Sequence, residues 1–446
     1  MPESIEPALL ARSASSAGLR LESWYAESSR IFRFEAHEKV QHAWLGSRAG
    51  CCVCARSGEV ERLFFTDDVT TEGISALLEG RPPRRPRLGR ITGARSAVLA
   101  DTPGDPQAEI RAVLVDMHLS LLNDVSGLHG VGLAYAQEEI SFVSTHPDAE
   151  PRSGVDFRGE LTARWYTETG GRRLLHSLGR FGLSAQSLIE QTRDGGDLKR
   201  AIKRSLRTDP PWPCPEGEVP LLWHPRALTT LLIPFLRAFE GDTMSGSGSW
   251  LRHADWPQPM AFSVVQDGAP GSVDHEGTER HAVTLFADGH PRAALCDRLT
   301  ARKLGVEPTG NCRRAAWNGP AVPAPWRIRL QGHAACDDTA RELQWGIAIH
   351  DADLIEWNPR ERRTVLRVTD SNLIHQGTEG EGVEPFLVAG DLLGILGKLV
   401  GFTARVAPIG VPLTKQGQEL VAEFLLPTAI SAPVPLSGRV PMKNYW

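Results

Sequence analysis

The sequence lacks the long apolar segments that membrane proteins and secreted precursors carry. Residues 1–18 contain two acidic residues and no apolar core of signal-peptide length. The longest apolar stretch, residues 385–402, is interrupted by Asp391 and Lys398, so it is too short and too polar to span a bilayer. We therefore expect a soluble, cytoplasmic protein that does not bind membranes.

A disulfide framework and an excess of basic charge are also missing. The seven cysteines are odd in number and scattered along the chain, which is typical of reduced thiols in a cytosol. Lysine and arginine number 49 against 54 aspartates and glutamates, and this gives a net charge of -5. Because the chain also lacks a basic stripe, we expect no nucleic-acid partner.

Common catalytic motifs are absent as well. The sequence has no phosphate-cradling glycine loop, no G-x-S-x-G nucleophile elbow and no internal repeat. Cys51, Cys52 and Cys54 lack the two-residue gap that lets paired thiolates chelate one ion, and core packing explains them better. Motifs alone therefore reveal no convincing catalytic constellation.

The composition describes a folded protein of two to three domains. The chain has 446 residues, of which 41% are hydrophobic and 23% are charged, so each domain can bury a core. Five prolines among residues 209–220 indicate a linker. We expect an α+β fold with an N-terminal helix-and-sheet α/β domain over 1–208 and a mainly antiparallel β-rich C-terminal domain over 221–446.

Local patterns predict individual elements within these domains. Alternation of apolar and polar residues predicts one half-buried strand over 31–45. Further strands are expected at 51–55, 60–65, about 130–145 and 158–169, and helices at 70–79, from Asp105-Pro106 onward, at 185–205 and at 225–240. Hairpin-type turn signals lie at Asp267-Gly268, Asp288-Gly289 and Asn318-Gly319.

The segment from His37 to His42 spells H-E-x-x-x-H, with Glu38 as its glutamate. Two histidines and a glutamate are the groups with which a zinc peptidase holds its metal and activates water. On a strand, however, an offset of five residues places the two histidines on opposite faces. We therefore favour ordinary strand histidines and keep a metal site at His37, Glu38 and His42 as the alternative.

The second half of the chain resembles the TldD/PmbA family, also called the modulator-of-gyrase family of metallopeptidases. The best segment is 271–314, with weaker likeness at 378–396 and 434–438. The residues that carry the resemblance, as candidates for substrate or partner contact or for structural roles, are Asp274, Glu276, Gly277, Gly289, Thr300, Ala301, Thr309, Gly310, Asn311, and Arg313 or Arg314.

The family has two kinds of subunit, and the resemblance implies that this chain is of the kind without zinc. TldD-type subunits carry H-E-x-x-x-H on a helix before an E-G-D-like segment, which here is 240–242. The matching ligand and base positions hold Leu232, Ile233 and Arg237, and no cysteine follows Cys336 to serve as a late ligand. The resemblance thus implies no catalytic residue and no cofactor in this chain.

As a TldE-like subunit, the chain would form a heterodimer with a TldD-like zinc peptidase subunit, which would hold the zinc. The pair would process or degrade small or unfolded peptides, including precursors of natural products. Two alternatives are a peptide-binding scaffold without a proteolytic role and a self-sufficient metallopeptidase that uses residues 37–42. Candidate partner anchors are Trp250, Trp256, Trp317 and Trp326, although packing in the core of their own domain explains each of them better.

Overall fold

The computed structural model describes most of the chain. It covers residues 6–439 apart from 38–39, 58–59, 68, 81–105, 126–127, 129, 146–149, 170–171, 193–195, 207–210, 247–248, 253–259, 334 and 337–341. Within this coverage, no helix combines the length and the apolar character needed to cross a bilayer.

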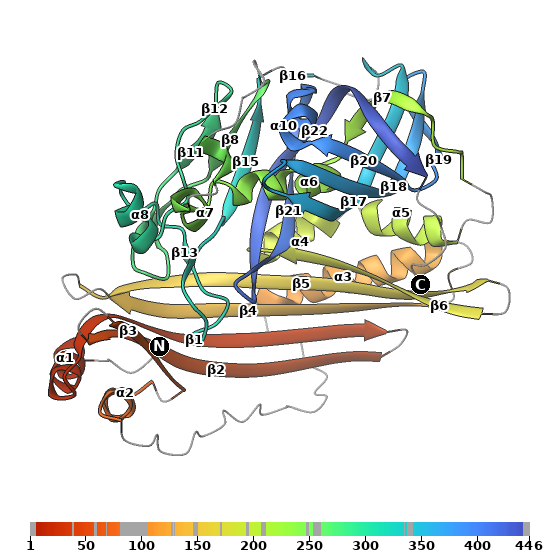
Figure 1. Ribbon diagram of the computed structural model, residues 1–446. Coiled ribbons are helices and arrows are strands. Elements are labelled where there is room, and N and C mark those ends of the chain that lie inside the picture. The colour runs from red at the N-terminus through yellow and green to blue at the C-terminus, as the bar shows by residue number, and fades with distance from the viewer. Residues whose placement is uncertain are drawn as a thin grey trace.

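The N-terminal part forms a sheet of six antiparallel strands (Figure 1). The long middle strands pair along nearly their whole length, so the sheet is a broad platform rather than a set of short ribbons. The order across it is β3 (Val60–Thr66), β2 (Val40–Ser57), β1 (Arg20–His37), β4 (Val131–Thr145), β5 (Arg152–Thr169) and β6 (Arg172–Gly182).

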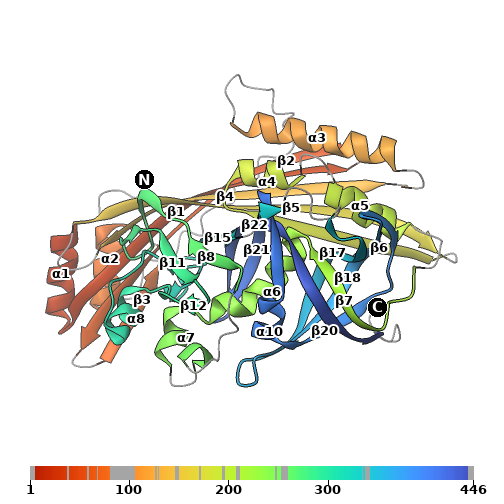
Figure 2. The same ribbon diagram turned by 90° about the horizontal axis from the view of Figure 1, so that it is seen from above.

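Five helices cover one face of this sheet, as the α/β prediction requires (Figure 2). Apolar side chains from the helices and strands form two clusters on that face, one at each end of the sheet. The helices are α1 (Pro7–Ser16) and α2 (Thr71–Leu78) at the end near β3, and α3 (Pro106–Asp124), α4 (Ala185–Thr192) and α5 (Gly196–Ser205) at the other end.

The opposite face of the sheet carries the C-terminal region. Successive side chains of a strand point to opposite faces. On β1, Trp24 and Ala26 join the cluster under the helices, while Tyr25 packs against Val273 of the C-terminal region. All three are buried because both faces of the sheet are covered at this point.

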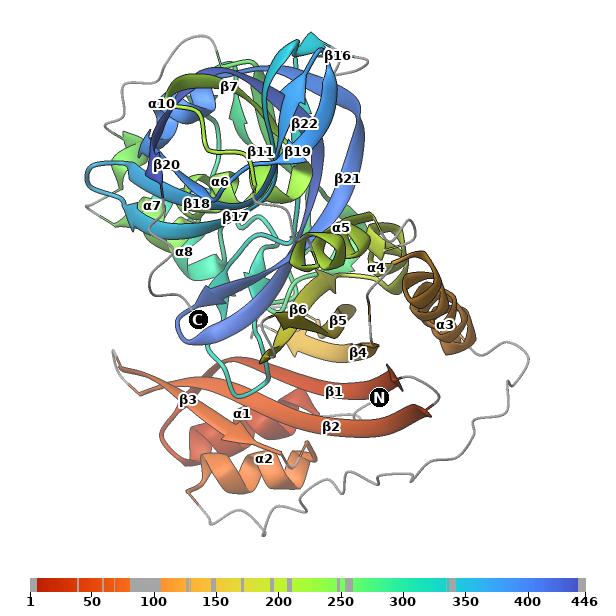
Figure 3. The same cartoon turned by 90° about the vertical axis from the view of Figure 1, so that its right-hand side faces the viewer.

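The C-terminal region encloses a helix within a ring of strands. The ring consists of β7 (Gly217–Trp223), β17 (Trp345–Asn358), β18 (Arg363–His375), β20 (Phe386–Asp391) and β22 (Gln418–Arg439). Each strand pairs with the next, β20 pairs with β22, and β22 pairs back to β7. Helix α6 (Pro225–Arg237) lies inside (Figure 3).

The C-terminal region contains further elements around this ring. They are α7 (Gly241–Ser245), η1 (Trp250–Arg252), β8 (Phe262–Gln266), β9 (Ala269–Val273), β10 (Glu279–Arg280), β11 (Val283–Ala287), β12 (His290–Pro291), α8 (Arg298–Leu304), β13 (Cys312–Arg313), β14 (Val322–Pro323), β15 (Arg327–Gly332), β16 (Ala335–Cys336), β19 (Thr378–Gly382), α10 (Leu392–Gly397) and β21 (Leu399–Lys415).

Several local predictions are confirmed and three are wrong. The helices predicted at 70–79, from Pro106 and at 225–240 form, and the helices predicted at about 185–205 form as α4 and α5. Strand 31–45 is instead a hairpin in which Glu35 pairs with His42. The sequence has none of the usual turn residues at Glu38 and Lys39, so the alternation alone predicted one continuous strand.

Of the three predicted hairpin turns, only the one in which both residues have a positive φ forms a hairpin. Asp288 and Gly289 have φ of 51° and 76° and join the antiparallel pair β11 and β12. Asp267-Gly268 connects β8 to β9, which pair with other strands, so that hairpin prediction is wrong. Asn318-Gly319 lies in the longer loop between β13 and β14, and it does not form a two-residue hairpin.

The predicted domain division at 209–220 stays a prediction. Strand β7 begins at Gly217, inside this proline-rich segment, and joins the C-terminal ring.

The interior position of α6 makes a prediction about stability. Leu228 is fully buried in α6, whereas Leu299 on α8 is 51% exposed. We expect Leu228→Ala to lower the free energy of unfolding by about 2–5 kcal/mol. Leu299→Ala, the matched control, should change it by less than about 0.5 kcal/mol. Urea titration followed by circular dichroism measures both, and equal losses would contradict a core role for α6.

Candidate functional site

Asp274, Glu276 and Gly277 form one tight turn between β9 and β10, and the 309–314 segment lies against it. Asp274 is fully buried at its start, and its Oδ1 accepts hydrogen bonds from the backbone N–H groups of Glu276 and Thr278, each at 2.9 Å. Its Oδ2 accepts from the backbone N–H of Cys312 at 2.8 Å. Gly277 supplies the positive φ of 75° that the turn needs. Asp274 therefore ties the turn to the 309–314 segment.

The 309–314 segment closes over the turn through its own small residues. The Oγ1 atom of Thr309 accepts from the backbone N–H of Cys296 at 2.7 Å, and Asn311 Nδ2 donates to Thr309 Oγ1 at 3.0 Å. Gly310 has φ of 71°, and a Cβ there would lie 2.2 Å from the carbonyl oxygen of Glu279. The backbones approach so closely that only glycine fits at this position.

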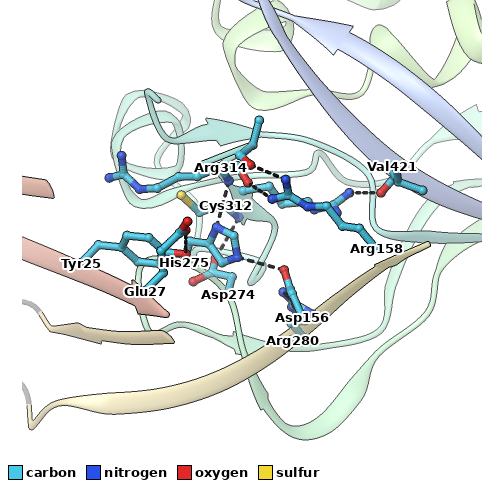
Figure 4. A network of polar contacts seen from close by, with 12 residues as sticks. Tyr25, Glu27, Asp156, Arg158, Asp274, His275, Arg280, Cys312, Arg314 and Val421 are labelled. Atoms are coloured by element: carbon cyan, nitrogen blue, oxygen red, sulfur yellow. Dashed lines mark hydrogen bonds and ion pairs between the residues drawn. The ribbon is translucent and has the colours of Figure 1, made fainter. Parts of the chain in front are cut away.

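A buried ion pair joins this turn to the N-terminal sheet (Figure 4). His275 Nε2 lies 2.9 Å from Asp156 Oδ2 on β5, and Arg280 donates to Asp156 Oδ1 at 2.9 Å. The backbone N–H of Arg314 donates to His275 Nδ1 at 2.9 Å, so the imidazole hydrogen lies on Nε2 and points to Asp156. The neutral histidine thus bridges two segments of the C-terminal region to β5.

Burial and charge shift the pKa values of this pair. Burial alone would raise the pKa of Asp156, but the Arg280 guanidinium and the hydrogen bond from His275 hold it well below its usual range. Burial lowers the pKa of His275 to about 4. At neutral pH the carboxylate is therefore charged and the imidazole is neutral, as the hydrogen bonds require.

Aromatic and carboxyl groups from β1 and β4 complete the network. The rings of Tyr25 and Phe142 lie 5.1 and 4.6 Å from the His275 ring, between centroids. Tyr25 Oη donates to Glu27 at 2.9 Å (Figure 4). Burial raises the pKa of Glu27 and, together with the neighbouring Glu27 charge, that of Tyr25. Both groups serve the contact between the two parts of the chain.

Beside this network lies a cavity of about 210 Å³ between the N-terminal sheet and α8. Its charged lining has both signs and includes Glu276, Asp297, Arg298 and Arg314. Burial first, and then the charges of Asp274 and Asp297, raise the pKa of Glu276 to about 7. Burial likewise raises the pKa of Asp274 to about 6. Glu276 can therefore hold or release a proton near neutral pH at the cavity wall.

Arg314 connects the cavity to the network. Its guanidinium donates to the carbonyl of Gly319 at 2.7 Å, contacts Cys52 Sγ at 3.7 Å and lies 5.3 Å from the centre of the Tyr25 ring. Burial raises the pKa of the Cys52 thiol, so this cysteine is not an activated nucleophile. The predicted residues of the turn and of the 309–314 segment thus lie together. Their contacts mainly hold these two segments to each other and to the N-terminal sheet.

The three positions on α6 do not fit a zinc site. Leu232 is fully buried in the apolar core, and Ile233 packs against that core. Arg237 donates to the carbonyl of Thr414 at 2.9 Å. Neither aliphatic side chains nor a guanidinium can ligate a metal ion.

The 37–42 motif lies partly outside the described residues. The backbone of His37 ends β1 and that of His42 lies in β2, so the two histidines are on different strands of a hairpin rather than on a helix. Glu38 lies outside the described residues.

Most of the tryptophans considered as partner anchors contact their own chain. Trp250 packs against Trp357 in the core around α6. Trp317 packs beside Tyr25, and the Trp326 ring is 4.9 Å from the Arg280 guanidinium. Trp256 lies outside the described residues.

Comparisons with known proteins agree with the resemblance. Residues 216–429 match the family model for the PmbA/TldA metallopeptidase C-terminal domain. A metalloprotease of Methanothermobacter thermautotrophicus is 22% identical over 313 residues, which are 67% of each chain. A metalloprotease TldD homolog of Buchnera aphidicola is 33% identical over 79 residues, covering 17% of this chain and 16% of that protein.

Two solved structures share the fold along nearly the whole chain. TldE from Thermococcus kodakarensis superimposes with a TM-score of 0.69 at 16% identity, covering 96% of this chain and 99% of the other. A protein from Bacteroides thetaiotaomicron titled as a modulator of DNA gyrase gives 0.72 at 16% identity, with 98% and 100% covered. These matches define a metallopeptidase-related protein of the TldE and TldD fold. Residues 216–429 of this chain thus form a domain of the PmbA/TldA metallopeptidase C-terminal type.

Sequence reasoning found the residues of the turn but missed those that hold it to the sheet. Asp156 lies 119 residues from His275 and sits in an ordinary alternating strand. Tyr25 and Glu27 likewise carry no motif. Four consecutive buried residues at 24–27 are a distinctive feature of this contact, but burial is visible only in the structure.

The close approach at Gly310 predicts a specific loss of stability. Gly305, at the end of α8, has a similar φ of 69° but open space around its missing Cβ. We expect Gly305→Ala to cost about 1 kcal/mol, from the left-handed backbone alone. Gly310→Ala should cost at least about 1 kcal/mol more, because its Cβ also meets backbone atoms. Thermal unfolding of both variants tests this, and equal costs would contradict the clash.

The raised pKa of Glu276 predicts that removing its charge increases the stability of the fold at high pH but not at low pH. The folded chain binds a proton at Glu276 that the unfolded chain has released, so stability falls as pH rises from the unfolded value of 4.5 to about 7. Glu276→Gln should therefore stabilise the chain at pH 8 by on the order of 2 kcal/mol, with little effect at pH 4.5. The control is Glu307→Gln, at an exposed site. An equal effect at both pH values would contradict the shift.

Proposed function

We propose that this chain is the TldE-like, non-catalytic subunit of a heterodimeric TldD/TldE-type zinc metallopeptidase. The partner is a TldD-like subunit that holds the catalytic zinc and the general base. The substrates are small or unfolded peptides, including precursors of peptide-derived natural products, and the complex works in the cytoplasm.

The apolar burial of α6 is the observation that carries this proposal. In a metallopeptidase, ligand side chains must face a space that admits both the metal ion and the substrate. Here Leu232 fills the core inside the strand ring, and Arg237 is held by a backbone carbonyl. Peptide-bond hydrolysis by the family's zinc chemistry therefore needs a second chain.

The role proposed for this subunit is to shape the chamber and to contact extended peptides. A peptidase that accepts varied sequences needs affinity that ignores side chains, and strand edges provide it through backbone hydrogen bonds. The Asp156 contact, which joins the C-terminal region to the N-terminal sheet, supports a continuous wall for such a chamber. A wall of this kind affects substrate access without doing chemistry.

Cleavage by the reconstituted pair tests the assignment. Purified alone with added Zn²⁺, this chain should not cleave peptides, whereas the pair should. Glu→Gln at the partner's motif glutamate should reduce the rate at least about 100-fold, as expected for loss of a general base. Glu38→Gln in this chain should leave the rate nearly unchanged.

Three results would contradict the proposal. A pair inactivated by Glu38→Gln would assign catalysis to the 37–42 segment. Cleavage by this chain alone would make it self-sufficient. Light scattering that shows no complex with the TldD-like chain, together with peptide binding by this chain alone, would favour the scaffold without a proteolytic role.

A further inference from the structure

Two histidines and a glutamate converge at a place remote from the Asp274 turn. His224 directly precedes α6, His350 lies on β17 and Glu379 lies on β19. The Nε2 atoms of His224 and His350 lie 3.0 and 2.7 Å from the two carboxylate oxygens of Glu379. One ligand atom from each side chain lies within 4.8 Å of the other two. Within the described residues, no other group of three such side chains meets this criterion.

Strand register brings the three side chains together. Strands β7 and β17 are parallel, with Trp223 opposite Ile349, so the next residues, His224 and His350, lie side by side. The backbone N–H of His224 donates to the carbonyl of Ile349 at 3.0 Å, and the two imidazoles stack with centroids 4.0 Å apart. Pairing of β18 with β19 then places Glu379 across from them.

This donor set matches a divalent transition metal. Two imidazole nitrogens and one carboxylate oxygen, with a fourth position left for water, form a common three-ligand zinc set. His350 is 3% exposed, whereas His224 and Glu379 are 27% and 25% exposed. An ion could therefore enter from solvent and keep a water ligand. Asn372 Nδ2 lies 3.3 Å from Glu379 Oε2 and orients the carboxylate.

Arg200 on α5 competes with a metal at this place. Its Nη1 lies 2.7 Å from His350 Nδ1, and a guanidinium can only donate. The Nδ1 atom therefore accepts, and the hydrogen lies on Nε2, where it is donated to Glu379. A metal on Nε2 requires that hydrogen to move to Nδ1 and Arg200 to turn away. Asp370, whose Oδ2 lies 3.9 Å from Arg200 Nε, can receive the displaced guanidinium.

We propose that His224, His350 and Glu379 form a binding site for one divalent transition-metal ion, with Zn²⁺ as the best chemical match. The ion would fasten the start of α6 to β17 and β19. Arg200 sets its affinity by competing for His350. The site is separate from Leu232, which lies eight residues, or about 12 Å of helix, further along α6. Binding of a metal ion at this site would contradict the expectation, drawn from the family resemblance, that this chain holds no metal.

Metal titration of the full chain tests the site. After removal of metal with a chelator, calorimetric titration with ZnCl₂ should show one ion per chain. Co²⁺ should give the intense visible absorption of a four-coordinate ion. His224→Ala and Glu379→Gln should each weaken binding by at least about tenfold. His224 is the preferred variant, because it is more exposed than His350 and its loss disturbs the core less.

Matched controls separate this site from other histidines and from the proposed function. His375→Ala, at an exposed position at the end of β18, should leave Zn²⁺ affinity unchanged, and so should His37→Ala. Arg200→Gln should strengthen binding about tenfold, because an amide oxygen can accept the Nδ1 hydrogen. Arg204→Gln, which removes a neighbouring pair with Asp370 but no His350 contact, should not.

The outcomes are distinct. Absence of Zn²⁺ binding, or binding that persists in His224→Ala and Glu379→Gln, would overturn the site. Loss of binding in His37→Ala would assign the metal to the 37–42 segment instead. Peptide cleavage does not enter this test, so its result is independent of the subunit role proposed above.

Discussion

The arrangement of the whole molecule depends on one buried carboxylate. Asp156 projects from the N-terminal sheet into the C-terminal region, where Arg280 balances its charge and His275 donates a hydrogen bond to it. A buried charge that loses its partner is strongly destabilising, so Asp156 and Arg280 have to be kept together as long as this contact stays buried. Because His275 is also held by the backbone of Arg314, the constraint extends to the 309–314 segment. One network of contacts therefore links the sheet, the turn and the 309–314 segment.

Helix α6 places apolar side chains in the space that the strands enclose. A helix enclosed by strands can present either ligands to a cavity or apolar side chains to a core, because the same space cannot serve both. In this chain the core occupies it: Leu228, Leu231 and Phe235 are fully buried. The strand ring then has a structural reason to close tightly around the helix. The stability of the ring and the absence of ligands on α6 follow from the same side chains.

Predictions from local sequence were correct for elements that a single local physical requirement determines. Pro106 at a helix start, the apolar face of α6 and the left-handed pair Asp288-Gly289 all have a single local cause. The resemblance likewise selected the residues that gather around Asp274. It left open whether they bind a substrate or hold the structure. Both carboxylate oxygens of Asp274 accept hydrogen bonds from backbone N–H groups, so this residue has a structural role.

The sequence by itself determined the family resemblance of the second half, the α+β class and the helices of strong periodicity, because these depend on neighbouring residues or on ordered motifs. Only the tertiary structure decided which distant groups meet. Asp156 contacts His275, which lies 119 residues away in the sequence, and Glu379 contacts His224 at a separation of 155 residues. Such contacts are set by strand register and by the packing of one layer on another. These are properties of the assembled chain, and no local window of sequence contains them.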